Sequence, residues 1–302
     1  MRKVILSNGQ SPGDLLVMTR AIKELNETFP DYMIDVRTPC PQIFENNPRL
    51  ISLKNDDPEV EKFNIEYPEI HNSGWSGIHF TEAFIRDVEN KLNVKLQRSG
   101  MLPEIWISDL EKTWINQVET EFGWVGPFWV INAGMKQDNE LKNYHRWQEV
   151  ANLFNEYFKD KVKLVQVGEK SHIHPELKGV LNLVGKTDLR QLIRLVYHAH
   201  GTVTPISFLT HLSAAFEQPA VIVAGAKESR RWECYQNQFY LATNGCVNCG
   251  IYDGCWLGGK LKNCKDLVST DKGMVPRCFE LIKPYQIIKA IKDYYEGGAL
   301  PL

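Results

Sequence analysis

Five of the seven cysteines in this 302-residue chain are concentrated in one C-terminal segment. Two of them form a Cys-x2-Cys knuckle between Gly245 and Gly250. Thiolates at this spacing can bind one metal ion together, and a second pair completes the tetrahedral coordination that zinc or iron adopts with soft sulfur ligands. The segment therefore predicts a metal site, and the alternative is a group of buried thiols without metal. The five residues are Cys246, Cys249, Cys255, Cys264 and Cys278.

A second candidate for chemistry is Asp14, which follows Gly13 at the turn between the first predicted strand and the first predicted helix. A carboxylate in this position stands at the carboxyl edge of a sheet, where backbone N–H groups can face a ligand. Two interpretations are open. Asp14 acts on a ligand, or it caps the helix, as aspartate often does.

The elements that position Asp14 form a β-loop-α-β unit. Residues 2–6 are an apolar strand, the loop to Gly13 is rich in Gly, Ser and Pro, and a helix with an apolar side runs from Asp14 to Pro30. Residues 33–37 make a second strand. This unit predicts a parallel, doubly wound α/β sheet. The region 51–103 is less regular, apart from a helix near 81–92.

A second α/β cycle begins after Gly126-Pro127. We predict domains at 1–125 and 126–283, with a Cys-rich finger at 244–279, and a closing helix at 284–302 that crosses back to the first domain. Two such domains imply a cleft that can hold a ligand. Strands are predicted at 128–132, 162–167, 180–183, 201–204 and 221–224, and helices at 147–157, 189–198, 208–216 and 284–295.

Composition excludes some classes of protein. Hydrophobic residues are 43% and charged residues 24%, as in globular domains, and the net charge of −2 gives no basic excess for nucleic acid, although a local basic patch stays open. No run of eighteen apolar residues predicts a membrane span, and the apolar start at 1–6 is too short for a signal peptide. We therefore expect a cytoplasmic protein with reduced thiols.

Residues 11–22, Ser-Pro-Gly-Asp-Leu-Leu-Val-Met-Thr-Arg-Ala-Ile, followed by Phe29-Pro30, resemble the opening of the ADP-heptose heptosyltransferases. Arg20 stands where that family usually has proline. The resemblance implies a GT-B fold, in which two Rossmann-like domains face each other across a cleft. It also implies that Asp14 is the general base for the acceptor hydroxyl.

Residues 183–192 and 210–215 extend the resemblance to the donor side, where the family has a His-Leu-Ala-Ala-Ala segment. Ser207, Thr210 and His211 are the donor-site candidates, because a helix that starts near Ser207 would direct its N–H groups at a pyrophosphate. Without the resemblance, His211 would be interpreted as a packed core histidine. Ile206 and Phe208 depart from the family's Asp-Ser/Thr-Gly and put the contacts at those positions in doubt.

Further donor contacts follow from the resemblance alone. His145, before Arg146-Trp147, aligns with a family lysine that pairs with donor phosphate, and Arg146 or Lys142 could supply the charge instead. Glu169 stands where the family offers a carboxylate to the nucleotide ribose. The alternatives are a solvated basic loop and a surface glutamate.

The cysteine pattern resembles one branch of the family, the autotransporter (protein) heptosyltransferases, which carry an iron-binding finger. That resemblance selects Cys246, Cys249, Cys264 and Cys278 as ligands of one structural iron or zinc, with Cys255 as the spare. It also makes His79 a weaker candidate on the acceptor side, together with His71.

Together these features predict a glycosyltransferase that moves a heptose-like sugar from a nucleoside-diphosphate donor, with ADP-heptose as a candidate, to a hydroxyl of a glycan or protein. One alternative is transfer to a modified nucleobase, and another is a catalytically silent nucleotide-sugar-binding subunit. A homo-oligomer stays open.

Overall fold

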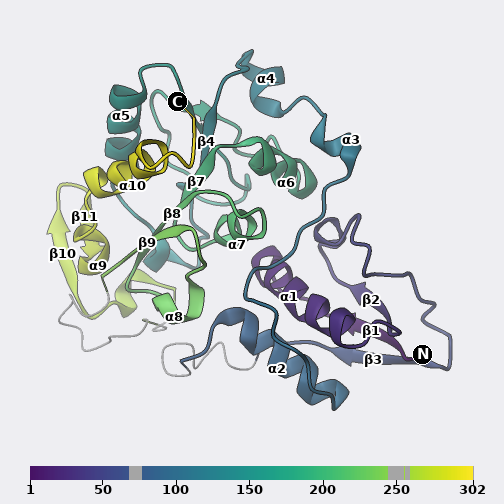
Figure 1. Ribbon diagram of the computed structural model, residues 1–302. Helices are drawn as coiled ribbons and strands as arrows, with labels where there is room; N and C mark the ends of the chain where they lie inside the picture. The colour runs from purple at the N-terminus through teal and green to yellow at the C-terminus, as the bar shows by residue number, and fades with distance from the viewer. Residues whose placement is uncertain (68–76, 244–254, 256–258, 302) are drawn as a thin grey trace.

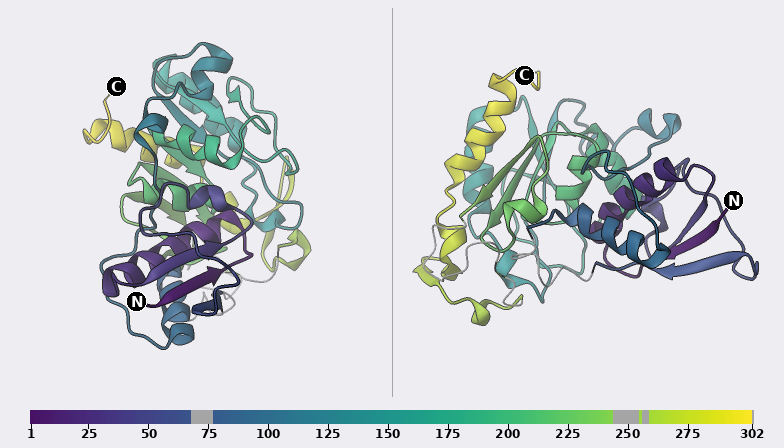
Figure 2. Two further views of the ribbon diagram at one scale, coloured as in Figure 1. Left: turned by 90° about the vertical axis from the view of Figure 1, so that its right-hand side faces the viewer. Right: turned by 60° about the horizontal axis from the view of Figure 1, so that its bottom comes forward.

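The computed structural model describes residues 1–67, 77–243, 255 and 259–301. The ribbon divides into a smaller N-terminal domain and a larger C-terminal domain, which lie side by side (Figure 1, Figure 2). Both are α/β, as the sequence predicts. In the part of the chain that is described, no helix is long and apolar enough to cross a membrane.

In the described residues, the first domain has a three-stranded parallel sheet in the order β2-β1-β3. Its strands are β1 (Lys3–Ser7), β2 (Met33–Arg37) and β3 (Val60–Asn64), and its main helices are α1 (Pro12–Thr28) and α2 (Phe80–Leu92). The apolar side of α1 is fully buried, which explains why helical periodicity was readable there. Strand β3 was missed, because it pairs on one side only and its sequence Val-Glu-Lys-Phe-Asn is largely polar.

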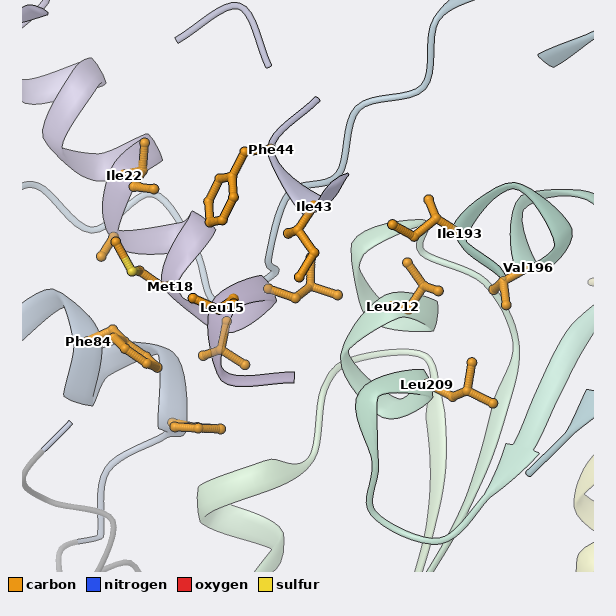
Figure 3. Packing of buried hydrophobic residues seen from close by; sticks show 14 of the residues in the cluster. Leu15, Met18, Ile22, Ile43, Phe44, Phe84, Ile193, Val196, Leu209 and Leu212 are labelled. Carbon is orange, nitrogen blue, oxygen red and sulfur yellow. The ribbon is translucent and has the colours of Figure 1, made fainter. Parts of the chain in front are cut away.

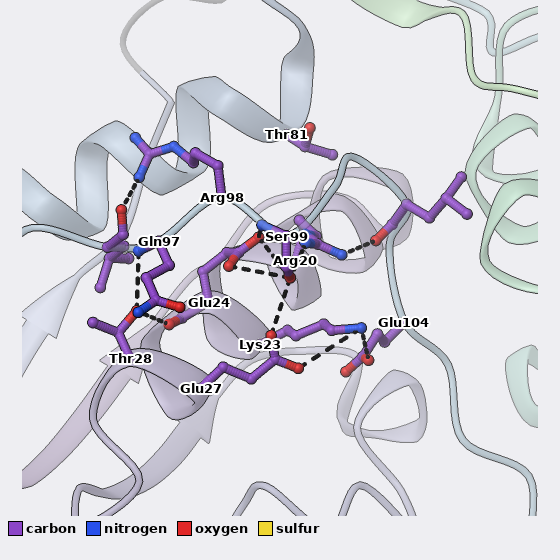
Figure 4. A network of polar contacts seen from close by, with 12 residues as sticks. Arg20, Lys23, Glu24, Glu27, Thr28, Thr81, Gln97, Arg98, Ser99 and Glu104 are labelled. Atoms are coloured by element: carbon purple, nitrogen blue, oxygen red, sulfur yellow. Dashed lines mark hydrogen bonds and ion pairs between the residues drawn. The ribbon is translucent and has the colours of Figure 1, made fainter.

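A buried polar network holds the segment after α2 against α1 (Figure 4). Arg20 is only 3% exposed, and its guanidinium contacts Glu24 and donates to Oγ of Ser99 at 2.6 Å. Backbone N–H groups of Gln97 and Glu104 donate to threonine hydroxyls of α1. The arginine that replaces the family's proline therefore has a structural role here, in which it anchors the returning chain.

The second domain has a parallel sheet in the order β6-β5-β4-β7-β8-β9, counted over the described residues. Alternate residues of its strands enter different clusters, so that Val130 packs toward α6 and α7 while Trp129 and Ile131 pack toward α5 and α10. Burial on both faces accounts for the continuous apolar runs of these strands. The strands are β4 (Phe128–Ile131), β5 (Lys163–Gln166), β6 (Leu181–Asn182), β7 (Gly201–Thr204), β8 (Ala220–Gly225) and β9 (Gln238–Ala242), and the helices are α5 (Trp147–Phe158), α6 (Leu189–His198), α7 (Phe208–Ala215) and α10 (Pro284–Glu296).

The closing helix α10 does not cross back to the first domain, so that prediction was wrong. It packs on α5 and β8, and Ile287 and Ile291 are fully buried there. The indole of Trp129 donates to the hydroxyl of Tyr295 at 2.8 Å, which fixes the helix against the centre of the second sheet. The region between Cys234 and Cys278, expected to be irregular, contains β9 and a hairpin of β10 (Leu267–Thr270) and β11 (Gly273–Pro276).

The two domains share one hydrophobic cluster (Figure 3). Leu15 and Met18 of α1, Phe84 of α2, Ile193 of α6 and Leu212 of α7 all belong to it, so side chains of both domains pack in one cluster. This continuous core fixes the N-terminus of α1 against the second domain.

Arg190 of α6 adds polar contacts across the same junction. Its guanidinium forms a bidentate pair with Glu111 of α3 (Asp109–Lys112) at 2.6 and 2.7 Å. It also donates to the backbone carbonyls of Gln42 and Trp106. The Arg190 hydrogen bonds lower the pKa of the Glu111 carboxyl to about 2, against the opposing effect of burial.

Candidate active site

The carboxylate of Asp14 lies at the N-terminus of α1 and uses its two oxygens differently. Oδ2 accepts from the backbone N–H of Ser11 at 3.1 Å and from its hydroxyl at 2.5 Å. Oδ1 accepts from the Tyr67 hydroxyl at 2.9 Å. Burial, with the Asp14 charge, raises the pKa of Tyr67 well above its usual range, so Tyr67 stays a donor. One oxygen thus completes the helix cap, and the other points toward the domain junction.

His211 of α7 lies directly against this helix start. A side-chain Cβ at Gly13 would lie 3.4 Å from Cδ2 of His211 and 3.8 Å from its Nε2, which is ordinary van der Waals contact, so the ring lies directly against the backbone of the helix start. The Nδ1 atom of His211 is 2.9 Å from the Tyr235 hydroxyl. Burial lowers the pKa of His211 to about 4, so its imidazole is neutral at pH 7.

Glu233 lies beside His211 and Tyr235. It ends the short helix α8 (Arg230–Glu233), and its Oε1 lies 3.2 Å from Nε2 of His211. The residue is 2% exposed. Burial raises the pKa of Glu233 to about 8, with Lys142 opposing the shift and Asp14 adding to it. At neutral pH the imidazole is therefore neutral and the carboxyl holds its proton.

Lys142 brings a positive charge to the same place. It ends the short 3-10 helix η3 (Glu140–Lys142) in the loop after β4, and its Nζ lies 2.7 Å from Oε1 of Glu228. Burial alone would lower the pKa of Lys142, but the Glu228 carboxylate more than offsets this and raises it. The side chain of Lys142 is 23% exposed, so the ammonium retains access to solvent and to an anion.

Sheet topology explains why these loops converge. The chain passes from β4 outward to β5 and β6 and then returns to β7 on the other side of β4. The crevice at the carboxyl ends of strands where the order reverses is the usual ligand site of such sheets. The loop with Lys142 follows β4, and α7 with His211 follows β7.

Aromatic rings enclose the group from the first domain. Phe80 stacks on Trp232 with ring centroids 5.2 Å apart, and it also contacts the rings of Tyr67 and His211. The ring of His79, at the N-cap of α2, packs edge-on against Tyr235. Burial lowers the pKa of His79 to about 4. These rings help to keep water from His211, Glu233 and Tyr235, which are buried, and this strengthens the electrostatic interactions among them.

Ser207 and Thr210 form the reciprocal cap of α7. Oγ of Ser207 accepts from the N–H of Leu209 at 3.2 Å, and Oγ1 of Thr210 accepts from the N–H of Ser207 at 3.1 Å. Thr210 is fully buried, whereas Ser207 is partly exposed. Ile206 is 6% exposed and packs in an apolar cluster with residues of β8 and β9.

The structure does not bring His145, Arg146 or Glu169 to this group. His145 lies 3.0 Å from Glu280, and Arg146 pairs with the same carboxylate at 2.6 Å. Glu169 is largely exposed and accepts from the Ser171 hydroxyl. Of the predicted phosphate contacts, Lys142 alone joins the group of Asp14 and His211 within the described residues.

The predicted metal ligands are described only in part, because Cys246 and Cys249 lie outside the described residues. Burial raises the pKa of the Cys278 thiol to about 11, and Cys264 and Cys255 add to the shift, so each of these two thiols lies near Cys278. Over the described ranges, no three His, Cys, Asp or Glu side chains are grouped closely enough to hold a metal ion.

The sequence did not identify Tyr67, Glu228, Glu233 or Tyr235. Tyr67 lies between β3 and α2, and the other three follow β8 in a segment whose sequence shows no clear periodicity. The available signal was their position after a buried parallel strand, where loops of such sheets carry function. A separate open hollow of about 380 Å³ lies at the end of β2, but its Asp35 carboxylate is occupied by backbone N–H groups and Arg37.

The assembled group can perform a proton transfer and hold an anion. It offers an oriented carboxylate, a neutral imidazole linked to a buried carboxyl, and a partly exposed ammonium, on loops from both domains.

Residues 111–250 match the model of the family described as Glycosyltransferase family 9 (heptosyltransferase). The matched region contains Lys142, His211 and Glu233 but not Asp14. No curated protein matches the chain.

Solved structures share the fold over nearly the whole chain. A glycosyl transferase family 9 protein from Veillonella parvula aligns with a TM-score of 0.68 at 14% identity, covering 96% of both chains. ADP-heptose lps heptosyltransferase II of E. coli aligns with a TM-score of 0.63 at 16% identity, covering 97% of this chain and 98% of that one. The iron-containing, dodecameric heptosyltransferase TibC, solved in complex with ADP-D-beta-D-heptose, aligns with a TM-score of 0.67 at 16% identity, covering 98% of this chain and 76% of that one.

Proposed function

Because residues 111–250 are a glycosyltransferase family 9 (heptosyltransferase) domain, we propose that this glycosyltransferase moves a heptose-like sugar from ADP-heptose to a hydroxyl group of a glycan or protein. The observation that carries the proposal is the position of Asp14. Its carboxylate, on the first domain, lies close enough to His211 and Lys142 of the matched domain for its charge to favour the protonated form of both.

In the proposed reaction, Oδ1 of Asp14 takes the proton of the acceptor hydroxyl. The acceptor oxygen attacks the anomeric carbon of the donor sugar, and the bond from that carbon to the diphosphate breaks. The nucleoside diphosphate leaves with the electron pair of this bond. Tyr67 donates to Oδ1 and thereby holds the carboxylate in place for the transfer.

Lys142 is the proposed contact for the leaving diphosphate. Its ammonium is partly exposed and stands at the switch point of the second sheet, where the N-terminus of α7 also points. Arg146 is the weaker candidate, because its guanidinium already pairs with Glu280 and Glu149. The charge on Lys142 would stabilise the negative charge that develops on the departing group.

A structural iron or zinc belongs to the same proposal. The donor set, two thiols of a knuckle with Cys264 and Cys278, fits a soft ion held by four sulfurs, and Cys278 has two further thiols nearby. Such an ion would order the finger and take no part in the transfer. We place the protein in the cytoplasm, where these thiols stay reduced. A homo-oligomer, supported by the dodecameric relative, is tested by light scattering.

Release of nucleoside diphosphate from ADP-heptose, measured with candidate acceptors, tests the function. Asp14→Asn should lower turnover by a factor on the order of 10² to 10⁴, the usual contribution of a general base, while ADP affinity stays within about twofold. Tyr67→Phe, which keeps the carboxylate, should cost less.

Wild-type turnover in Asp14→Asn would refute the role of the base. Tight donor binding by the wild type without product, for any glycan or protein acceptor, would instead indicate a sugar-nucleotide-binding subunit.

A further inference from the structure

One oxygen of the Glu233 carboxyl is buried without a hydrogen-bond partner. Oε1 is fixed by Nε2 of His211 at 3.2 Å, but Oε2 contacts no donor among the described residues. A buried polar atom without a hydrogen-bond partner destabilises the folded state relative to one that has a partner. Folded proteins contain few buried polar atoms that lack a hydrogen-bond partner, so the state of this oxygen requires an explanation.

The chemistry of the pair determines what Oε2 can bind. If the carboxyl proton lies on Oε1, Oε2 is a carbonyl oxygen and accepts; if it lies on Oε2, this atom is a hydroxyl and donates. The phosphates of a sugar nucleotide carry no proton at neutral pH, so they fit only the second state, and the negative charge of Asp14 beside Glu233 would repel them. A neutral hydroxyl both donates and accepts, so it fits either state.

We propose that Oε2 of Glu233 forms a hydrogen bond with a hydroxyl of the transferred sugar and so selects the donor. This inference rests on the proposed function and identifies the residue that recognises the sugar. His211 and Tyr235 position the carboxyl, and Gly13 brings the start of α1, with Asp14 beside it, against the same histidine. A sugar held by Glu233 therefore lies next to the proposed base.

Other polar groups of the second domain are already engaged. Ser207 and Thr210 cap α7, and Oε1 of Glu228 pairs with Lys142 at 2.7 Å. Ile206 is apolar and buried. Glu233 thus contacts the sugar, while Lys142 binds the diphosphate. Substitution of Glu233 should therefore change the affinity for the nucleotide sugar alone, and substitution of Lys142 should change the affinity for the nucleoside diphosphate as well.

The experiment measures affinities by calorimetry for a panel of ADP-, UDP- and GDP-sugars and for the matching nucleoside diphosphates. For the nucleotide sugar that the wild type binds best, Glu233→Met should weaken binding about tenfold and leave the nucleoside diphosphate within about twofold. Glu233→Gln should stay within about threefold for both, because its amide oxygen can replace Oε2 as acceptor while its NH₂ donates to His211. Lys142→Met is the matched control and should weaken both ligands.

Deoxy analogues of that sugar nucleotide give a second measurement that needs no variant. Removal of one particular hydroxyl should weaken binding to the wild type about tenfold, and the same removal should have little effect in Glu233→Met, as expected for two partners of one hydrogen bond. Equal losses for sugar nucleotide and nucleoside diphosphate in Glu233→Met would overturn the inference, as would a wild type indifferent to every deoxy position. Failure of the wild type to bind any member of the panel would overturn the proposed function itself.

Discussion

The contacts of Asp14 confirm that it caps a helix and are compatible with the second interpretation, action on a ligand, which stays a prediction. Oδ2 caps α1 through Ser11, and Oδ1 remains for Tyr67 and the junction. A residue pattern alone could not separate these uses, because the same strand-to-helix turn requires a cap and exposes a ligand-facing edge.

Of the remaining site residues, some were predicted from the sequence and others were not. His211 and Lys142 were identified through the family resemblance, and the structure places both near Asp14. Glu233 and Tyr235 join them only because the loop after β8 folds back under α7. Such contacts depend on the path of an aperiodic loop, and no local pattern encodes that path.

Glu233 should make stability depend on pH. Its pKa rises from 4.5 to about 8 on folding, so the folded state holds the proton more tightly than the unfolded chain. This contribution is complete below pH 4.5 and is lost as the pH rises toward 8. Glu233→Gln, which does not titrate, should match the wild type near pH 5 and exceed it by a few kcal/mol at pH 8, because each pKa unit corresponds to about 1.4 kcal/mol.

Urea unfolding at pH 5, 6.5 and 8 measures this difference. The charged and titratable groups that face Glu233 are His211, Lys142, Asp14, Glu228 and Tyr235. A constant difference between Gln variant and wild type over the whole range would show that the carboxyl titrates normally.

At the scale of elements, burial decided which predictions succeeded. Strands β4, β7 and β8 are apolar because both faces of the sheet are covered, and they were found within a residue or two of their ends. The sequence could not predict which domain α10 packs against, because its amphipathic pattern fits either domain equally well. Trp129 and Phe158 provide the surface that it covers, and neither signals this in the sequence.

The cysteine finger makes an element-scale prediction. Protein purified under reducing, chelator-free conditions should contain about one iron or zinc per chain. Serine in place of Cys264 or Cys278 should abolish the metal and lower thermal stability, because a site of this kind orders a segment that has little apolar core of its own.

Cys255→Ser is the matched control, since Cys255 also lies near Cys278. Elemental analysis of the three variants decides the ligands. If the Cys255 variant loses the metal and the Cys264 variant retains it, the metal site exists but Cys255 is the ligand in place of Cys264. A wild-type protein without transition metal would rule the site out.

At the scale of the molecule, the junction between the two domains is one continuous hydrophobic core rather than a surface contact between two separate cores. Fully buried Leu15 and Met18 of the first domain pack in one cluster with Leu212 of the second. We therefore predict a single cooperative unfolding transition. Leu212→Ala should lower the free energy of unfolding by about 2–5 kcal/mol, as core truncations do, and should move that transition without splitting it.

Scanning calorimetry measures both quantities. Two resolved transitions in Leu212→Ala, of which one keeps the wild-type midpoint, would show instead that the domains fold independently.

The shared core has a consequence for recombination between related enzymes. An acceptor-binding half taken from another protein would have to supply both the apolar surface that faces α6 and α7 and the carbonyl groups and carboxylate that Arg190 holds. A graft lacking either would leave leucine side chains or a buried guanidinium without partners. New acceptor specificity is therefore more accessible through point changes in the first domain than through exchange of that domain as a module.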